Sequence, residues 1–195
     1  RYERHVFIIR EGVVSCMAHV EPDGEAPFTL YGAGIGVGIA DLYVPRANAS
    51  TYHLRAIVPG RICSLPSKTL RRHLEDLEEN QQQRILAASL YNQSTGALIQ
   101  SMISSRPLLG QRLAMLLTGL QSLAARGKTK LDTLNVTHDE LSDLVLSDRA
   151  SVTRALHHME REGLVELGYR SVRITDKLRE GRPEWTALCE TFSKV

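Results

Sequence analysis

The chain has 195 residues, of which 43% are hydrophobic and 24% are charged, and its formal net charge is +2. This length and apolar content allow one or two domains with buried cores. No apolar run approaches the roughly 18 residues that a membrane-spanning helix needs, so the composition argues against a helical membrane protein.

Short β-rich runs alternate with turns across residues 1–70. The strand candidates are residues 6–10, 12–20, 28–31, 53–58 and 61–65, and Pro22-Asp23-Gly24 is a strong turn signal. Strands this short and this closely spaced predict a small sandwich or roll. The glycines between Gly32 and Gly38 lack the G-x-G-x-x-G spacing and a strand-loop-helix context. They therefore predict tight turns and close strand approach rather than a dinucleotide-binding loop.

Residues 67–105 contain no proline and no glycine before Gly96, which predicts one helix of about 35 residues. Apolar positions recur on it at alternating spacings of three and four, a pattern typical of a two-stranded coiled coil. The predicted dimer interface consists of Ala88, Tyr91, Thr95, Leu98 and Met102. An apolar face can equally belong to a core, but a helix this long in so small a chain favours dimerisation. Pro107 marks a hinge, and residues 108–125 predict the next helix.

A helix start signal follows at Thr137. Thr137 and Glu140 form a T-x-x-E capping box, in which each side chain satisfies an unpaired backbone donor of the other residue. Leu141, Leu144 and Val145 then follow at helical spacing and predict one apolar stripe. The pattern is interrupted at residues 147–148, which predicts a tight turn.

A second helix is predicted over residues 149–162, with Asp148 as its N-cap and Gly163 as the residue that ends it. Its inward face is predicted to hold Val152, Ala155, Leu156 and Met159. The residues left facing outward are Arg149, Ala150, Thr153, Arg154 and His157. Guanidinium groups on an exposed first turn suit the major groove of DNA, where arginine bonds bidentately to guanine.

Two short strands are predicted around Gly168, within residues 164–165 and 167–174. On this hairpin Tyr169, Arg170 and Arg173 are placed to touch the phosphate backbone. A capped helix, a tight turn, a second helix with a basic first turn and a hairpin, in this order, indicate a DNA-reading winged helix. Charge adds little to this interpretation, since residues 126–195 contain twelve Lys and Arg against twelve Asp and Glu.

The run over residues 139–167 resembles the helix-turn-helix of the Crp/Fnr superfamily of bacterial transcription regulators, and the rest of the chain follows that family's order. The resemblance implies an α+β protein with three parts: a cupin-like effector-sensing β-roll (1–70), a connecting and dimerisation helix (71–106) and a winged-helix DNA-binding domain (107–195). By the same comparison about 30 residues precede Arg1. We expect a cytoplasmic homodimer that binds a pseudo-palindromic operator, with RNA polymerase as a further partner and no membrane association.

The family commonly has Arg-Glu-x-x-x-Arg at the start of the recognition helix, and the matching positions here are Arg149, Ala150 and Arg154. A glutamate at the second position accepts a hydrogen bond from cytosine, so Ala150 predicts an operator unlike the TGTGA half-site of the cyclic-AMP receptor protein. Arg149 and Arg154 are predicted to read bases, with Ser151 and Thr153 assisting. Thr137, Ala150, His157, Tyr169 and Arg170 complete the predicted DNA-contacting set.

The resemblance does not imply that this chain binds the cyclic nucleotide that some family members bind. The glutamate that holds the ribose in cyclic-nucleotide-binding members is missing from Gly38-Ile39-Ala40, and the arginine of their phosphate cassette is missing near Ser50 and Thr51. Arg46 would need a shifted loop to replace that arginine, and Arg55 aligns with a different family position. Two polar residues that contact the nucleotide from the long helix align with Gly96 and Ala97. We therefore expect no bound cyclic nucleotide.

Other sensing chemistries are equally weakly supported. Cys16, Cys63 and Cys189 form no clustered set for an iron-sulfur centre, and His19 and His53 are isolated histidines rather than a haem site. We therefore expect no bound cofactor or metal. We also expect no enzymatic activity, because the sequence contains no recognisable catalytic set. The predicted function is a Crp/Fnr-type regulator that is constitutive or controlled by an effector other than cyclic AMP. The alternative is a winged helix used for protein interaction or as a scaffold.

Overall fold

The computed structural model describes residues 5–20, 24–39, 42 and 52–181. Its N-terminal part consists of two antiparallel sheets of three strands each, ordered β4-β1-β6 and β3-β2-β5. The bounds of these strands are β1 His5–Ile9, β2 Val13–Val20, β3 Gly24–Tyr31, β4 Gly36–Val37, β5 Tyr52–Val58 and β6 Ile62–Pro66. The predicted roll is thus confirmed, although β3 begins earlier than predicted and β4 was not predicted.

The roll is held together by apolar side chains buried between its strands. One cluster of buried residues consists of Ile9, Val14, Cys16, Tyr31, Ile35 and Val37. Gly34 and Gly38 have φ angles of +89° and +91°, which confirms that the glycine-rich segment makes tight turns. This segment connects β3 to β4, and β4 pairs antiparallel with β1, so it does not form a dinucleotide-binding loop.

The helical middle of the chain is divided into two helices, which corrects the prediction of a single long one. Helix α1 (Ser67–Glu75) ends at Asp76, and α2 (Glu79–Ser104) begins after Glu78. Leu77 packs against the cluster of Val6, Leu42 and Leu74, so the chain turns to bury this leucine. Glu78 is extended, and its backbone N–H donates to Gln81 Oε1 at 3.3 Å, which starts α2 afresh.

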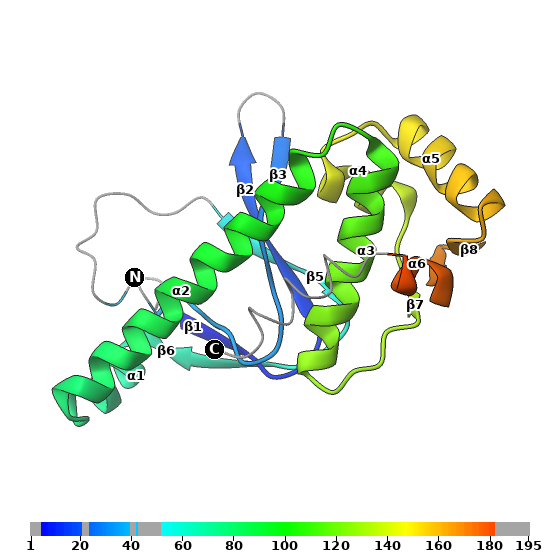
Figure 1. Ribbon diagram of the computed structural model, residues 1–195. Helices are drawn as coiled ribbons and strands as arrows, with labels where there is room; N and C mark the ends of the chain where they lie inside the picture. Colours follow the sequence, from blue (N-terminus) through cyan, green and yellow to red (C-terminus); the bar gives the residue numbers. More distant parts are fainter. Residues whose placement is uncertain (1–4, 21–23, 40–41, 43–51, 182–195) are drawn as a thin grey trace.

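Helix α2 runs along the roll and packs most closely on β3 (Figure 1). Gly96 permits this approach, because a Cβ atom there would lie 2.0 Å from Thr29 Oγ1 and 3.0 Å from the Leu30 carbonyl oxygen. The glycine thus serves helix packing, whereas the resemblance aligns this position with a ligand contact.

The C-terminal part begins with α3 (Leu109–Arg126), close to the predicted bounds. It continues with β7 (Thr133–Leu134), α4 (His138–Val145), α5 (Arg149–Arg161), β8 (Val165–Gly168), β9 (Ser171–Ile174) and α6 (Asp176–Glu180). The strands form a sheet of order β7-β9-β8. Helix, turn, helix and hairpin are confirmed in the predicted order, while β7 and α6 were not predicted.

One continuous apolar core joins the two parts of the chain. It contains Val13 and Ile57 from the roll, Ile103 from α2, a row of leucines from α3, and residues of α4, α5 and the C-terminal sheet. Helix α3 is central to this core, since Leu113, Leu116, Leu117 and Leu120 are fully buried. The helix-turn-helix is therefore packed against the roll and α2 rather than tethered to them.

Gly96→Ala should lower the free energy of unfolding by about 1–3 kcal/mol, because the added methyl group collides with Thr29 and the β3 backbone. Gly119→Ala in α3 is the matched control, since nothing lies within 4 Å of the added Cβ atom there. This second variant should gain about 0.5–1 kcal/mol from helix propensity. Urea unfolding of both variants measures the difference, and equal stability of the two would contradict the packing argument.

Candidate nucleic-acid interface

Helix α4 begins with the capping box that the sequence predicts. Thr137 Oγ1 accepts a hydrogen bond from the Glu140 backbone N–H at 3.1 Å, and Glu140 Oε2 accepts from the Thr137 backbone N–H at 2.7 Å. The hydrogen bond from the Thr137 backbone holds the pKa of Glu140 below its usual range. Both groups are thus fixed at the end of α4 where its backbone N–H groups are unpaired.

The turn between α4 and α5 is made without glycine. Leu146 has a φ angle of +52°, in the left-handed region, and half of its side chain is exposed. A leucine in this conformation is strained, and the apolar packing of both flanking helices offsets the cost. Asp148 then caps α5, because its Oδ1 accepts from the Ser151 backbone N–H at 2.8 Å.

Helix α5 divides into the two predicted faces. Val152, Leu156 and Met159 are buried in the shared core, and Ala155 packs partly against it. Its exposed residues include Arg149, Ala150, Arg154 and His157, whereas Ser151 and Thr153 are half-buried. In Figure 1 this helix lies at the edge of the molecule, away from the roll.

Neighbouring polar groups hold both predicted base-reading arginines. Arg154 Nη2 donates to Ser151 Oγ at 2.8 Å on the same helix, and Arg149 Nη1 lies 3.4 Å from Asp139 Oδ2 on α4. These contacts are solvent-exposed and therefore weak. The guanidinium groups can leave them for DNA at little cost.

The hairpin of β8 and β9 presents its turn to solvent. Tyr169 is 94% exposed, and Arg170 is exposed with a φ angle of +50°. The turn is anchored, because the Arg170 carbonyl oxygen accepts from the Val136 backbone N–H at 3.0 Å, one residue before Thr137. Arg173 Nη1 lies 2.9 Å from Glu166 Oε2, so its charge is already partnered.

His138 was not among the predicted DNA-contacting residues. It is the first residue of α4, and its Nδ1 lies 2.8 Å from Thr153 Oγ1 on α5. Its position directly after the Thr137 N-cap is a sequence signal for an exposed first turn, but only the packing of α4 on α5 brings it to Thr153.

Polar contacts attach the helix-turn-helix to the rest of the chain. Arg55 on β5 lies 2.8 Å from Asp143 on α4 and 3.3 Å from Glu25 on β3. Gln100 Nε2 on α2 donates to the Leu144 carbonyl oxygen at 3.0 Å. Arg55 is therefore engaged between the two parts of the chain, which excludes it as a cation for a cyclic phosphate in this arrangement.

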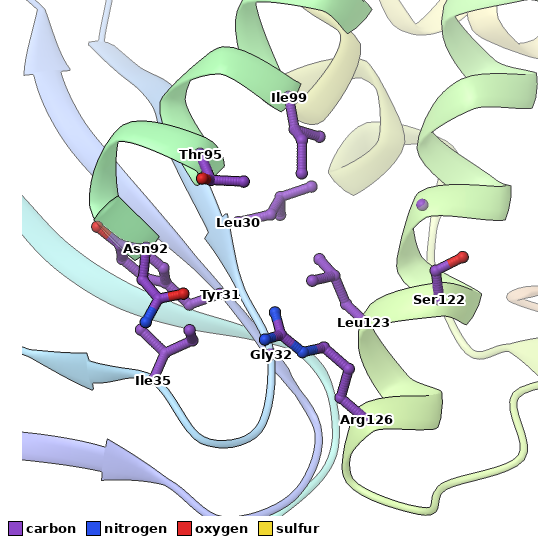
Figure 2. Close-up of a pocket in the computed structure, with 12 residues that line it drawn as sticks. Leu30, Tyr31, Gly32, Ile35, Asn92, Thr95, Ile99, Ser122, Leu123 and Arg126 are labelled. Atoms are coloured by element: carbon purple, nitrogen blue, oxygen red, sulfur yellow. The ribbon is translucent and has the colours of Figure 1, made fainter. Parts of the chain in front are cut away.

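The predicted dimer-interface residues on α2 differ in exposure. Ala88, Tyr91 and Leu98 are exposed, whereas Met102 packs against the core and Thr95 lines a pocket between α2, β3 and α3. Figure 2 shows Leu30, Ile99 and Leu123 around this pocket, with Arg126 extending from α3 toward Gly32. The close approach of α2 to β3 at Gly96 places Thr95 beside the roll, while Ala88, Tyr91 and Leu98 stay exposed.

The candidate sensing residues are dispersed. Cys16 is buried, and burial raises the pKa of its thiol to about 11, while Cys63 is exposed on β6. His53 lies 3.5 Å from Glu25 on the outside of the roll, and Ile39 follows β4. Within the described residues no three His, Cys, Asp or Glu side chains are grouped to hold a metal ion. The predictions that involve the His19 side chain, Ala40, Arg46, Ser50, Thr51 and Cys189 lie outside the part of the chain whose side chains are described.

Comparison with known proteins identifies the family of the helix-turn-helix region. Residues 111–179 match the Crp-like helix-turn-helix domain. No curated protein matches the sequence. Among the described residues, no helix combines the length and apolar character needed to cross a membrane.

Solved structures match over nearly the whole chain. A transcriptional regulator of the CRP family from Thermus thermophilus is 22% identical, with 100% of this chain and 90% of that chain covered and a TM-score of 0.68. A second Thermus thermophilus regulator, of the CRP/FNR family, is 23% identical over 96% of this chain and 88% of its own, with a TM-score of 0.64. The c-di-GMP-responsive regulator CLP from Xanthomonas campestris is 18% identical over 87% of this chain and 84% of its own, with a TM-score of 0.65.

The C-terminal domain is thus a Crp-like helix-turn-helix, and the chain as a whole has the fold of these regulators.

Arg55→Gln should loosen the docking of α4 on the roll, because it removes the cation that lies between the Asp143 and Glu25 carboxylates. We expect faster amide hydrogen exchange in α4, and a coupling energy of about 0.2–1 kcal/mol in a double-mutant cycle with Asp143→Asn. Arg61→Gln is the matched control, since Arg61 pairs with Glu11 within the roll. Equal exchange in α4 for both arginine variants would contradict a cross-domain role of Arg55.

Proposed function

We propose that this chain is a homodimeric transcription regulator that binds double-stranded DNA sequence-specifically in the cytoplasm. The observation that carries the proposal is α5, a helix capped by Asp148 whose first turns expose Arg149 and Arg154. It lies within a Crp-like helix-turn-helix domain, and its opposite face is buried. A helix presented in this way fits the major groove.

Base reading rests on the two arginines, each of which can donate two hydrogen bonds to guanine O6 and N7. Ala150 lies between them without a hydrogen-bonding side chain, so the base opposite it is contacted only by a methyl group. We therefore expect an operator unlike TGTGA, and recovery of that half-site by binding-site selection would contradict this. Thr137, Tyr169 and Arg170 flank α5 and are assigned to phosphate contacts, with Ser151, Thr153 and His157 assisting on α5.

Dimerisation is proposed through α2. Leu90, Tyr91 and Leu98 are 47%, 39% and 49% exposed along this helix, an unusual amount of apolar surface for one helix face. Pairing with a second α2 buries it in the manner of a coiled coil. Two-fold symmetry then requires a pseudo-palindromic operator with half-sites about one DNA turn apart.

Regulation is proposed to act through the docking of the helix-turn-helix on the roll and α2. The Arg55–Asp143 pair, the Gln100 hydrogen bond and the shared core link a signal on either of them to α4. A ligand shifts such an equilibrium only if it binds one arrangement better than the other. We propose an effector other than cyclic AMP, or constitutive activity, because the nucleotide-contacting residues of the family are absent from residues 38–39 and 96–97.

A second candidate function is a winged helix that binds a protein. Equal numbers of acidic and basic residues in residues 126–195, and the pairing of Arg149 and Arg173 with carboxylates, favour it. The two functions differ in salt dependence, because DNA binding releases counterions from phosphates. Tight, sequence-selective binding to genomic fragments excludes the second candidate.

Arg154→Ala should weaken binding to the selected operator by about 1–3 kcal/mol and relax one base preference, since a bidentate contact is lost. Fluorescence anisotropy at matched salt measures this. Arg161→Ala, two turns further along α5, is the control and should change the affinity for all sites alike. Parental binding by Arg154→Ala would show that α5 is not the recognition helix.

Leu98→Glu should convert the dimer to a monomer, because it places two carboxylates within the proposed α2 seam. Analytical ultracentrifugation reads the oligomeric state. Leu108→Glu is the matched control, because Leu108 is an exposed leucine in the turn before α3. A dimer that persists in Leu98→Glu but dissociates in Leu108→Glu would move the interface away from α2.

A further inference from the structure

The contact between His138 and Thr153 joins the two helices of the helix-turn-helix at the proposed DNA surface. His138 Nδ1 and Thr153 Oγ1 are 2.8 Å apart, and both side chains are half-buried. Thr153 is one of the α5 residues that we assign to DNA contact. The group that orients its hydroxyl therefore decides whether this hydroxyl can donate a hydrogen bond to DNA. A hydroxyl can donate one hydrogen bond, and its partner determines in which direction.

The charged groups around His138 come from both helices. Helix α5 contributes Arg149 and His157, and α4 contributes Asp139. Burial is the main cause that lowers the pKa of His138, followed by the nearby His157 and Arg149, while Asp139 acts in the opposite direction. In the free protein these surroundings therefore favour the neutral imidazole.

We propose that His138 positions the Thr153 hydroxyl according to its own protonation state, and that DNA binding takes up a proton at this histidine. This inference rests on the proposed DNA-binding function. It assigns to His138 a role as a positioning residue that neither the motif nor the family match supplies.

The chemistry requires only a proton from solvent. In the neutral tautomer with hydrogen on Nε2, Nδ1 accepts the Thr153 O–H, and only the lone pairs of Oγ1 face outward. When Nδ1 is protonated it donates to Oγ1 instead, and the Thr153 O–H is released to donate to a phosphate or base acceptor. One proton is gained, one hydrogen bond reverses, and no covalent bond between heavy atoms changes.

The direction of the pH dependence follows from linkage. Phosphates favour the imidazolium, so the pKa of His138 is higher in the complex than in the free protein, where it is depressed below 6.5. Affinity should therefore rise as pH falls through the DNA-bound pKa and level off below the free-protein pKa. The slope is at most about tenfold per pH unit for each protomer, because one proton is bound.

The test measures DNA affinity of the full chain between pH 5.5 and 8 at fixed ionic strength, with the selected operator as the probe. We expect the parent to bind more tightly as pH falls, and His138→Gln to be nearly pH-independent. His157→Gln should keep the slope and shift its midpoint upward, because a nearby positive charge is removed. His158→Gln is the matched control, since His158 pairs with Glu162 and should leave the profile unchanged.

Thr153 separates proton uptake from positioning. Because the released Thr153 hydroxyl can donate to a base acceptor, we expect the preferred base at the position it contacts to change with pH. Thr153→Ser should keep this change, whereas Thr153→Val should lose it. An NMR titration of His138 in the free protein gives a second readout, since Thr153→Val removes the hydrogen bond and should shift the midpoint even where DNA affinity is weakened.

The outcomes distinguish failure of the His138 role from failure of the proposed DNA-binding function. Sequence-specific binding by the parent that does not change with pH would overturn the role of His138 and leave the DNA-binding function intact. The same holds if His158→Gln flattens the profile and His138→Gln does not. Absence of sequence-specific binding at pH 6 and pH 8 alike would overturn the proposed function and this inference together.

Discussion

The structure depends on the burial of α3. Four consecutive turns of this helix place leucines in a core that also takes apolar side chains from the roll, α2, α4 and α5. Each fully buried leucine is worth about 1.5–3 kcal/mol relative to exposure, so α3 holds the roll and the helix-turn-helix together as one packed body. A change in the placement of the recognition helix must therefore repack this core or rotate α3 within it, because a close-packed interior does not deform gradually.

In addition to this apolar core, individual polar contacts join the helix-turn-helix to the roll and α2. Arg55 reaches from the roll to Asp143 on α4, while His138 at the N-terminal end of the same helix contacts Thr153 on α5. One eight-residue helix thus faces the roll with one side and the proposed DNA surface with its N-terminal end. This arrangement gives a physical route by which docking on the roll and the presentation of α5 influence each other.

Local signals in the sequence predicted the helix-turn-helix well. The Thr137–Glu140 capping box, the Asp148 cap and the Gly163 end are interactions between residues at most a few positions apart, so the sequence contains both partners. The break between α1 and α2 was missed, because it depends on Leu77 reaching a cluster formed with Val6 and Leu42. The two-residue strands β4 and β7 were missed for the same reason, since their partners β1 and β9 lie far away in the chain.

The sequence by itself determined the α+β order of elements, both faces of α5 and the replacement of the family glutamate by Ala150, since periodicity, capping and residue identity are local properties. Only the tertiary structure decided which edge of α2 is free, where Arg55 is engaged and that His138 meets Thr153. These depend on how closely Gly96 lets α2 approach β3 and on how α4 packs on α5. Packing joins residues 15 to 88 positions apart, as in the His138–Thr153 and Arg55–Asp143 pairs, and no spacing rule within a helix or strand reaches that far.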